Sequence, residues 1–305
     1  MMDAGVIGTG IMGRNHARVY SELKEVGDTY VFDLNTESAE SVAAWTGATA
    51  CSTMDELLRN VDLVSLAVPT RFHFDTAKQI IESGVHTLIE KPLCLTATEG
   101  EALIREIPDG ITVGVGHIER FNPIVSEIQK IVSDPKYIAF HRHNPASGRI
   151  TDASIVEDLM IHDIDILFNA LYPDHDYTFN ARGNGDIALV LGSFDHVAFY
   201  LSASRKSAKK IRSIYIEEAD RTIEGDFMTQ EIFVYRKPET YDQTNNLYRQ
   251  ENIIEKVLVN KVEPLKMELQ AFVRAARDRK PFLVTPEEAV LNLRICDAVK
   301  REMNS

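Results

Sequence analysis

Two short groups of polar residues could do chemistry on a bound ligand. The first is Glu90-Lys91-Pro92, which directly follows the mostly apolar run Val85–Ile89. An ammonium group can stabilise a developing alkoxide or exchange a proton with a hydroxyl. The second group is Asp158, His162 and Asp165, whose spacing places them on one face of a helix. Carboxylates one turn away on either side hold the pKa of an imidazole up toward neutrality, which suits proton transfer at physiological pH. His162 is therefore a candidate general base oriented by Asp158.

Lys91 is expected at the edge of a buried sheet. The run before it is short and ends in a charge pair and a proline, which is typical of a buried parallel strand. Pro92 has no N–H and biases Lys91 toward an extended conformation, so the chain must leave the sheet there. Open α/β sheets bind their ligands at the carboxyl ends of the strands, where Lys91 should therefore lie. The alternative is an ordinary strand-to-helix turn with a solvated lysine.

The helix that carries His162 is expected to be buried on most of its surface. Apolar residues occupy nearly every angle of the stretch 155–168. Carboxylates and an imidazole in such a helix are costly without partners, so they must face a polar cavity or a hydrogen-bond network. A metal site and a purely structural network both stay open at this point. The sequence has no second cluster with ligand spacing, however, so no metal is expected.

A glycine-rich turn near the amino terminus predicts a dinucleotide site. A strand-like segment precedes the turn and a helical stretch follows it, which is the context that such a fingerprint requires. The glycines permit a tight turn and let the backbone approach a pyrophosphate, while the helix offers N–H groups to the phosphates. The residues expected to contact the cofactor there are Gly8, Gly10, Ile11, Met12 and Gly13.

The next strand, Thr29–Phe32, ends in Asp33, 20 residues after Gly13. A carboxylate at this place accepts hydrogen bonds from the adenosine ribose and repels a 2′-phosphate. The stretch 34–44 contains no Lys or Arg that could hold such a phosphate. NAD is therefore favoured over NADP. The alternative is that Asp33 caps a helix beginning near Thr36.

Further strands alternate with short helices, which predicts a doubly wound parallel sheet, a Rossmann domain over residues 1–120. One strand ends at Pro69-Thr70, so that loop should line the cofactor together with Glu90 and Lys91. His73 follows in the first turn of the next helix. It is a further candidate cofactor contact, with a solvent-facing side chain as the alternative.

The last strand of this domain, Thr112–Gly116, leads into a polar cluster that contains His117, Arg120 and Asn122. Such a cluster at a strand end suggests a bound polar ligand, and these three residues are candidate substrate contacts alongside Lys91, Asp158 and His162. A solvated turn is the alternative. The two glycines of the strand suggest a close approach of another backbone or of a ligand.

Residues 121–305 are expected to form a second, α+β domain for substrate binding and oligomerisation. Several strand-like runs between residues 177 and 235 are separated by glycine-containing turns, which predicts a large, mostly antiparallel sheet. Two helices should close the chain. The exposed face of that sheet must be covered, so a homodimer or homotetramer is expected.

Composition excludes several classes of partner. The 305 residues carry a formal net charge of −13, with no large basic cluster, so a nucleic-acid partner is not expected. Three widely spaced cysteines, Cys51, Cys94 and Cys296, form neither a disulfide framework nor a zinc pattern. Cys94 is better interpreted as a small buried hydrophobe than as a nucleophile. The sequence shows no leader and no long apolar run. We therefore expect a cytoplasmic protein that does not bind a membrane.

The order and spacing of these motifs resemble the glucose-fructose oxidoreductase/inositol dehydrogenase/rhizopine catabolism (Gfo/Idh/MocA) family. The segments Glu268–Phe272 and Pro281–Thr285 also resemble the carboxyl end of that family. The motifs that carry the resemblance are Gly8-x-Gly10-x-x-Gly13, Asp33, Glu90-Lys91-Pro92 and Asp158-x-x-x-His162-x-x-Asp165.

The resemblance implies an NAD(P)-dependent oxidoreductase that acts on a small-molecule sugar or cyclitol hydroxyl. In this family the motif lysine and histidine, here Lys91 and His162, handle the proton while hydride passes to the nicotinamide. The stretch His117–Pro123 resembles the branch that acts on nucleotide sugars, which implies oxidation of the 3-hydroxyl of UDP-N-acetylglucosamine to a ketone. A free-sugar or inositol dehydrogenase of the same family and a non-catalytic NAD-sensing regulator are the alternatives.

Overall fold

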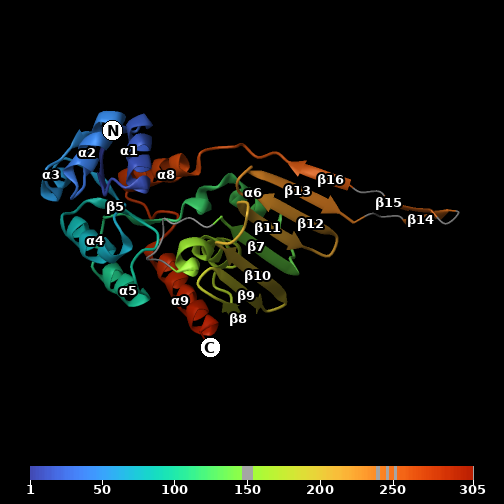
Figure 1. The fold of residues 1–305 in the computed structure, drawn as a ribbon. Helices are drawn as coiled ribbons and strands as arrows, with labels where there is room; N and C mark the ends of the chain where they lie inside the picture. Colours follow the sequence, from blue (N-terminus) through green and yellow to red (C-terminus); the bar gives the residue numbers. More distant parts are fainter. Residues whose placement is uncertain (146–153, 238–240, 245–246, 251–252, 305) are drawn as a thin grey trace. The chain divides into compact units, whose positions relative to one another are not determined.

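The computed structural model of the chain describes residues 1–145, 154–237, 241–244, 247–250 and 253–304 (Figure 1). These residues divide into two compact units. The first contains Met1–Phe121 and Glu263–Arg294, and the second contains Asn122–Val262 and Ile295–Ser305. The described part of the chain has no helix long and apolar enough to cross a membrane.

The first unit contains a six-stranded sheet in the order β3-β2-β1-β4-β5-β6, with every pair of neighbours parallel. This is the doubly wound topology that the alternation of strands and helices predicts. The strands are β1 (Met2–Ile7), β2 (Val26–Phe32), β3 (Thr49–Ala50), β4 (Leu63–Leu66), β5 (His86–Glu90) and β6 (Val113–Gly116). The helices are α1 (Ile11–Glu22), α2 (Thr36–Thr46), α3 (Met54–Leu58), α4 (His73–Glu82), α5 (Ala97–Arg105) and α8 (Pro264–Asp278), with 3-10 turns η1 (Thr70–Phe72) and η2 (Ile118–Phe121).

The expected assignment of residues 121–305 to a single second domain requires correction. The first boundary lies at Phe121, but the segment Glu263–Arg294 returns to the first unit. Its helix α8 packs on α1 and η2, and Val115 donates a backbone hydrogen bond to the carbonyl of Val284 (3.1 Å). A Cβ at Gly114 would lie 2.3 Å from the ring of Phe282, so this glycine leaves room for the returning segment. One of the two glycines of β6 therefore marks the approach of a side chain.

The second unit contains an eight-stranded sheet in the order β16-β13-β12-β11-β7-β10-β9-β8. Its neighbours are antiparallel except for β7 and β10, which are parallel, so the expectation of a large, mostly antiparallel sheet is confirmed. The strands are β7 (Tyr137–His143), β8 (Tyr177–Gly183), β9 (Ile187–Phe194), β10 (Val197–Ser204), β11 (Ile211–Glu217), β12 (Arg221–Asp226), β13 (Glu231–Arg236) and β16 (Ile253–Val257). The other elements are α6 (Pro123–Ile131), the antiparallel strand pair β14 (Tyr241–Thr244) and β15 (Leu247–Gln250), and the end of α9 (Pro286–Met303), a helix that spans the unit boundary.

The stretch expected as one helix around His162 has a mixed geometry. A five-residue α-helix, α7 (Ile161–Asp165), lies between the π-helical segments η3 (Val156–Met160) and η4 (Ile166–Leu171). A π turn contains more residues than an α turn, so side-chain positions outside α7 depart from the periodicity of a regular α-helix. Such segments occur frequently at functional sites.

The beginning of β5 contains a histidine that must stay neutral in the folded protein. The backbone N–H of Thr112 donates to Nδ1 of His86 (2.9 Å), which is possible only when that nitrogen is unprotonated. Burial, followed by the charge of Arg279, lowers the pKa of His86. The unfolded chain therefore binds more protons than the folded chain once the pH falls below the ordinary histidine pKa of about 6.5.

We expect the free energy of unfolding to decrease by about 1 kcal/mol for each pH unit below about 6, and part of this slope to disappear in His86→Asn. Asparagine keeps an acceptor oxygen near the position of Nδ1 but does not titrate. Urea denaturation between neutral and mildly acidic pH measures the slope. His196→Asn, at an exposed position, is the matched control. Parallel pH dependences of the wild type and His86→Asn would contradict this account.

Candidate functional site

The turn between β1 and α1 leaves space in front of the backbone where a pyrophosphate would lie. Gly8 has φ 92°, and a Cβ there would lie 2.7 Å from the carbonyl oxygen of Ala67. A Cβ at Gly13 would collide with the carbonyl oxygen of Gly8, so this glycine permits close packing of α1 on β1. A Cβ at Gly10, by contrast, would meet nothing within 4 Å. Gly10 is the N-cap of α1 and has no side chain to cap it, so the turn fits a dinucleotide pyrophosphate.

The carboxylate of Asp33 is held in place at the end of β2. Its Oδ2 accepts hydrogen bonds from the backbone N–H (2.7 Å) and the hydroxyl (3.0 Å) of Thr9, and its Oδ1 accepts the N–H of Asn35 (2.8 Å). The side chain that caps α2 is that of Asn35, which accepts the N–H of Ser38. The alternative in which Asp33 caps this helix is therefore wrong. The preorganised carboxylate is suited to accept hydrogen bonds from hydroxyl groups.

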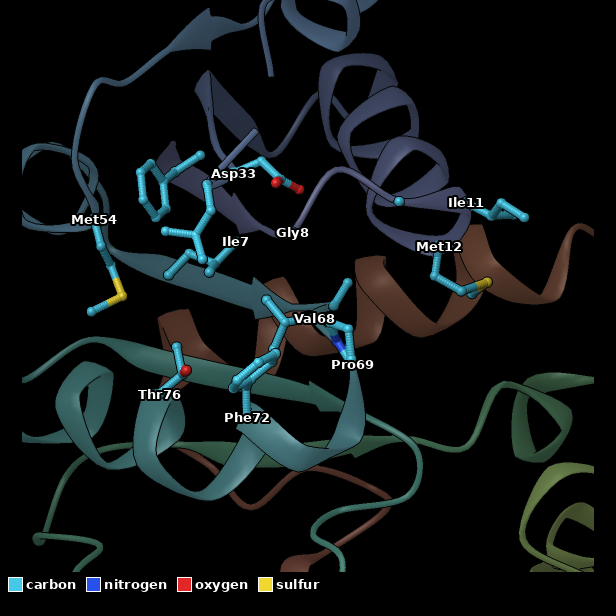
Figure 2. Close-up of a pocket in the computed structure, with 14 residues that line it drawn as sticks. Ile7, Gly8, Ile11, Met12, Asp33, Met54, Val68, Pro69, Phe72 and Thr76 are labelled. Atoms are coloured by element: carbon cyan, nitrogen blue, oxygen red, sulfur yellow. The ribbon is translucent and has the colours of Figure 1, made fainter. Parts of the chain in front are cut away.

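A cavity of about 770 Å³ lies over this edge of the sheet (Figure 2). Six of the predicted cofactor contacts line it: Gly8, Gly10, Ile11, Met12, Asp33 and Pro69. Figure 2 shows Met12 and Met54 at opposite ends of the cavity. The lining residues that sequence reasoning missed are Ile7, Phe32, Leu34, Met54, Ala67, Val68, Phe72 and Thr76. A partial signal was available, because several of them directly flank the predicted motifs.

Among the described residues, five other predicted cofactor contacts do not line this cavity: Gly13, Thr70, His73, Glu90 and Lys91. Gly13 faces the backbone of the glycine turn, and Thr70 begins η1. Glu90 ends β5, and Lys91 follows it with a cis peptide bond to Pro92. Strand β5 is buried along its whole length, so Lys91 directly follows a buried strand, as predicted from sequence.

His73 ties two loops of the site together. Its Nδ1 lies 2.9 Å from the carbonyl oxygen of Pro92, and its Nε2 lies 2.9 Å from that of Val68. The side chain is buried, so the expected alternative of a solvent-facing histidine is wrong. Burial lowers the pKa of His73 although both carbonyls favour its protonated form. Both ring nitrogens contact the protein backbone, which suits a role in holding the loops that begin at Pro69 and Lys91.

Glu90 is buried and anchored at both oxygens. Its Oε1 lies 2.9 Å from Nε2 of His16, and its Oε2 accepts the backbone N–H of Lys91 (3.2 Å). Burial by itself raises the pKa of Glu90, but the hydrogen bond from His16 and the charges of His16, Lys91 and His73 lower it, and the net shift is downward. Sequence reasoning missed His16. Its signal is its place three residues after Gly13, on the buried side of α1.

Cys94, three residues after Lys91, is buried. Burial raises the pKa of its thiol to about 12, so a thiolate is disfavoured near neutral pH. The interpretation as a small buried hydrophobe fits this position.

The polar cluster that follows β6 is buried, so the alternative of a solvated turn is wrong. Nη2 of Arg120 lies 3.0 Å from Oε1 of Glu288. Asn122 donates to the carbonyl of Phe227 (2.9 Å), and its Oδ1 accepts an N–H in the first turn of α6. Nε2 of His117 lies 3.4 Å from Nδ2 of Asn292. Each of the three predicted substrate-binding residues therefore has a polar group in contact with another part of the protein.

In the second unit, the carboxylates around His162 have partners. Nη2 of Arg205 lies 3.0 Å from Oδ2 of Asp158, and Asn169 donates to Oδ1 of Asp165 (3.0 Å). His162 itself is half-buried. Of the two expected surroundings, a polar cavity or a hydrogen-bond network, both acidic residues therefore have partners of the second kind.

A third carboxylate in this stretch anchors the helix. Arg142 of β7 donates through both Nε (2.9 Å) and Nη2 (2.7 Å) to Oδ1 of Asp163, and both side chains are almost completely buried. Asp163 directly follows His162 in α7. The ion pair therefore holds the residue next to His162 against the sheet of the second unit. Sequence reasoning missed it, because Asp163 lies outside the predicted polar face.

Comparisons with known proteins agree with this geometry. Residues 2–117 match the family described as "Oxidoreductase family, NAD-binding Rossmann fold" (GFO_IDH_MocA). The chain is 33% identical over 250 residues to the UDP-N-acetylglucosamine 3-dehydrogenase of Acidithiobacillus ferrooxidans, a match that covers 77% of each chain. A solved structure of that protein has a TM-score of 0.88, with 29% identity over 99% of this chain and 97% of the other. The chain is also 30% identical over 176 residues to an inositol 2-dehydrogenase/D-chiro-inositol 3-dehydrogenase of Halalkalibacterium halodurans, covering 53% of this chain and 51% of that protein.

Proposed function

The chain belongs to the Gfo/Idh/MocA family of oxidoreductases, and from this premise we propose that it oxidises the 3-hydroxyl of UDP-N-acetylglucosamine to a ketone with NAD. The observation that carries the proposal is the match to the Acidithiobacillus ferrooxidans dehydrogenase along most of both chains. An inositol dehydrogenase also matches, but over about half of each chain. Free sugars and cyclitols are therefore the second candidate substrates.

NAD, when bound, supplies the nicotinamide ring that accepts hydride from the sugar carbon. Gly8, Gly10 and the amino end of α1 would hold its pyrophosphate, and Asp33 would accept its adenosine ribose hydroxyls. Pro69, Thr70 and Glu90 would flank its nicotinamide half, with His73 holding their loops.

The chemistry on the sugar is assigned to Lys91 and His162. His162, oriented by Asp158, removes the proton from the reacting hydroxyl, and the Lys91 ammonium stabilises the alkoxide that develops. Arg205 balances the charge of Asp158. His117, Arg120 and Asn122 are proposed to fix the turn after β6, because polar groups of all three contact the protein. We also propose that the protein forms a homodimer or homotetramer. Light scattering of the purified protein would measure the mass of the assembly.

A substrate panel tests the function. The purified protein is incubated with NAD and, separately, with UDP-N-acetylglucosamine, UDP-glucose, free N-acetylglucosamine and myo-inositol, while NADH absorbance is followed. The proposal expects the highest kcat/KM for UDP-N-acetylglucosamine. A higher value for the free sugar or myo-inositol would instead identify a free-sugar or inositol dehydrogenase. NAD binding without turnover of any of the four compounds would favour a cofactor-sensing role.

The preference for NAD over NADP is assigned to Asp33. We expect Asp33→Ser to lower kcat/KM for NAD about 10- to 100-fold, because charge-assisted hydrogen bonds to the ribose are lost. The value for NADP should fall less, since the same change removes a charge that repels the 2′-phosphate. Steady-state kinetics with both cofactors measure the ratio. Asp28→Ser, at an exposed position of β2, is the control. An unchanged NAD-to-NADP ratio in Asp33→Ser would contradict the assignment.

A further inference from the structure

Three ionisable side chains meet in the interior of the first unit, next to the backbone of Lys91. They are His16 of α1, Glu90 of β5 and Glu268 of α8. One nitrogen or oxygen atom of each lies within 4.8 Å of those of the other two. His16 and Glu268 are completely buried, and Glu90 is 8% exposed. We call these three residues the His16 cluster.

The fold makes room for this cluster. Glu90 pairs with Gly116 of the neighbouring strand β6, and a Cβ at Gly116 would lie 3.2 Å from the Glu90 carboxylate. The second glycine of β6 therefore accommodates Glu90. Helix α8 brings Glu268 to the cluster from a part of the chain far from α1 and β5 in sequence.

Two carboxylates this close in a buried site do not both stay ionised without a compensating proton or cation. Glu90 accepts a backbone N–H and contacts His16, which favours its ionised form. One compensating proton then leaves the cluster with one net negative charge. The Lys91 ammonium is the cation that follows Glu90 in the chain.

Other ionisable groups lie around Glu90 and Glu268. Burial raises the pKa of Glu90, and the charges of Lys91 and then of His73, which lies on α4, lower it. The hydroxyl groups of Tyr20 in α1 and Ser65 form a hydrogen bond with an O–O distance of 2.7 Å. Burial first, and then the charge of Glu268, raises the pKa of Tyr20.

We propose that His16 and Glu268 are positioning residues for Lys91. They act through Glu90, whose carboxylate contacts His16 and accepts the backbone N–H of Lys91, and the net negative charge of the His16 cluster keeps the Lys91 amine protonated. The inference rests on the proposed role of Lys91 in the reaction. It adds two residues, one from α1 and one from α8, that are not among the residues lining the cofactor cavity.

The test replaces both carboxylates with isosteric amides. In Glu90→Gln/Glu268→Gln, the pH at which the Lys91 amine is half-protonated should fall by about one unit or more, because a nearby opposite charge is lost. Each single glutamine variant should shift it less, since the remaining carboxylate can still carry a negative charge. Competitive labelling of the amine with acetic anhydride, read by peptide mass spectrometry across a pH series, measures this value without cofactor or substrate.

Glu263→Gln, at an exposed position next to α8, is the matched control. His16→Gln is the second variant, because its amide can still donate to Glu90 but cannot titrate. It should retain the labelling curve of the wild type, while His16→Leu, which removes the donor, should lower kcat more than it changes KM for NAD. A labelling midpoint of the double variant equal to that of Glu263→Gln would overturn the inference. Because labelling needs no turnover, this result can be separated from a failure of the proposed function.

Discussion

Replacing Lys91 by methionine is expected to lower kcat about a thousandfold and to leave the affinity of the protein for NADH within about threefold of the wild type. The side chain keeps most of its length but loses the ammonium that stabilises the developing alkoxide. Rapid-mixing or steady-state assays give kcat, and quenching of NADH fluorescence gives the cofactor affinity. NADH affinity should change little although kcat falls, because Lys91 lies outside the cavity lined by the glycine turn and Asp33.

Two variants make this result specific. Lys24→Met makes the same change at an exposed position of the first unit and should retain full activity. Lys91→Arg keeps the positive charge with a different shape, and it should recover only part of the activity because the position of the ammonium matters as well as its charge. If Lys91→Met turned over at a rate close to that of Lys24→Met, Lys91 would have no role in the chemical step.

His162→Asn is expected to lower kcat by about two to four orders of magnitude, which is the usual contribution of a positioned general base. The variant should also lose the acidic limb of the pH–rate profile, because that limb reports deprotonation of His162 in the wild type. Profiles of kcat for both proteins measure this directly. The His196→Asn variant is the control, and an unchanged acidic limb in His162→Asn would assign the base to another residue.

Features encoded in short stretches of sequence could be predicted well. The glycine turn, Asp33 and the strand that ends before Lys91 each depend on neighbouring residues, and the structure contains all three. The role of Asn35 as the cap of α2 was missed because Asp33 and Asn35 are both good capping residues two positions apart.

Features that depend on distant segments could not be predicted. Nothing near His16 or Glu90 in sequence indicates that Glu268 will lie beside them, since α8 must first return to the first unit. The polar face of the His162 stretch was derived for a regular α-helix, and its π-helical ends have no sequence signal of that kind. The pairing of Arg142 with Asp163 likewise requires a strand and a helix to meet.

The carbon from which hydride leaves is the most direct test of the proposed function. The purified protein would be incubated with NAD and UDP-N-acetylglucosamine that carries deuterium at C3 of the sugar, and the nicotinamide product would be analysed by NMR and mass spectrometry. The account predicts that the label appears at C4 of the nicotinamide and that turnover is slower than with unlabelled substrate. Formation of NADH without deuterium would contradict it, because hydride would then come from a different carbon.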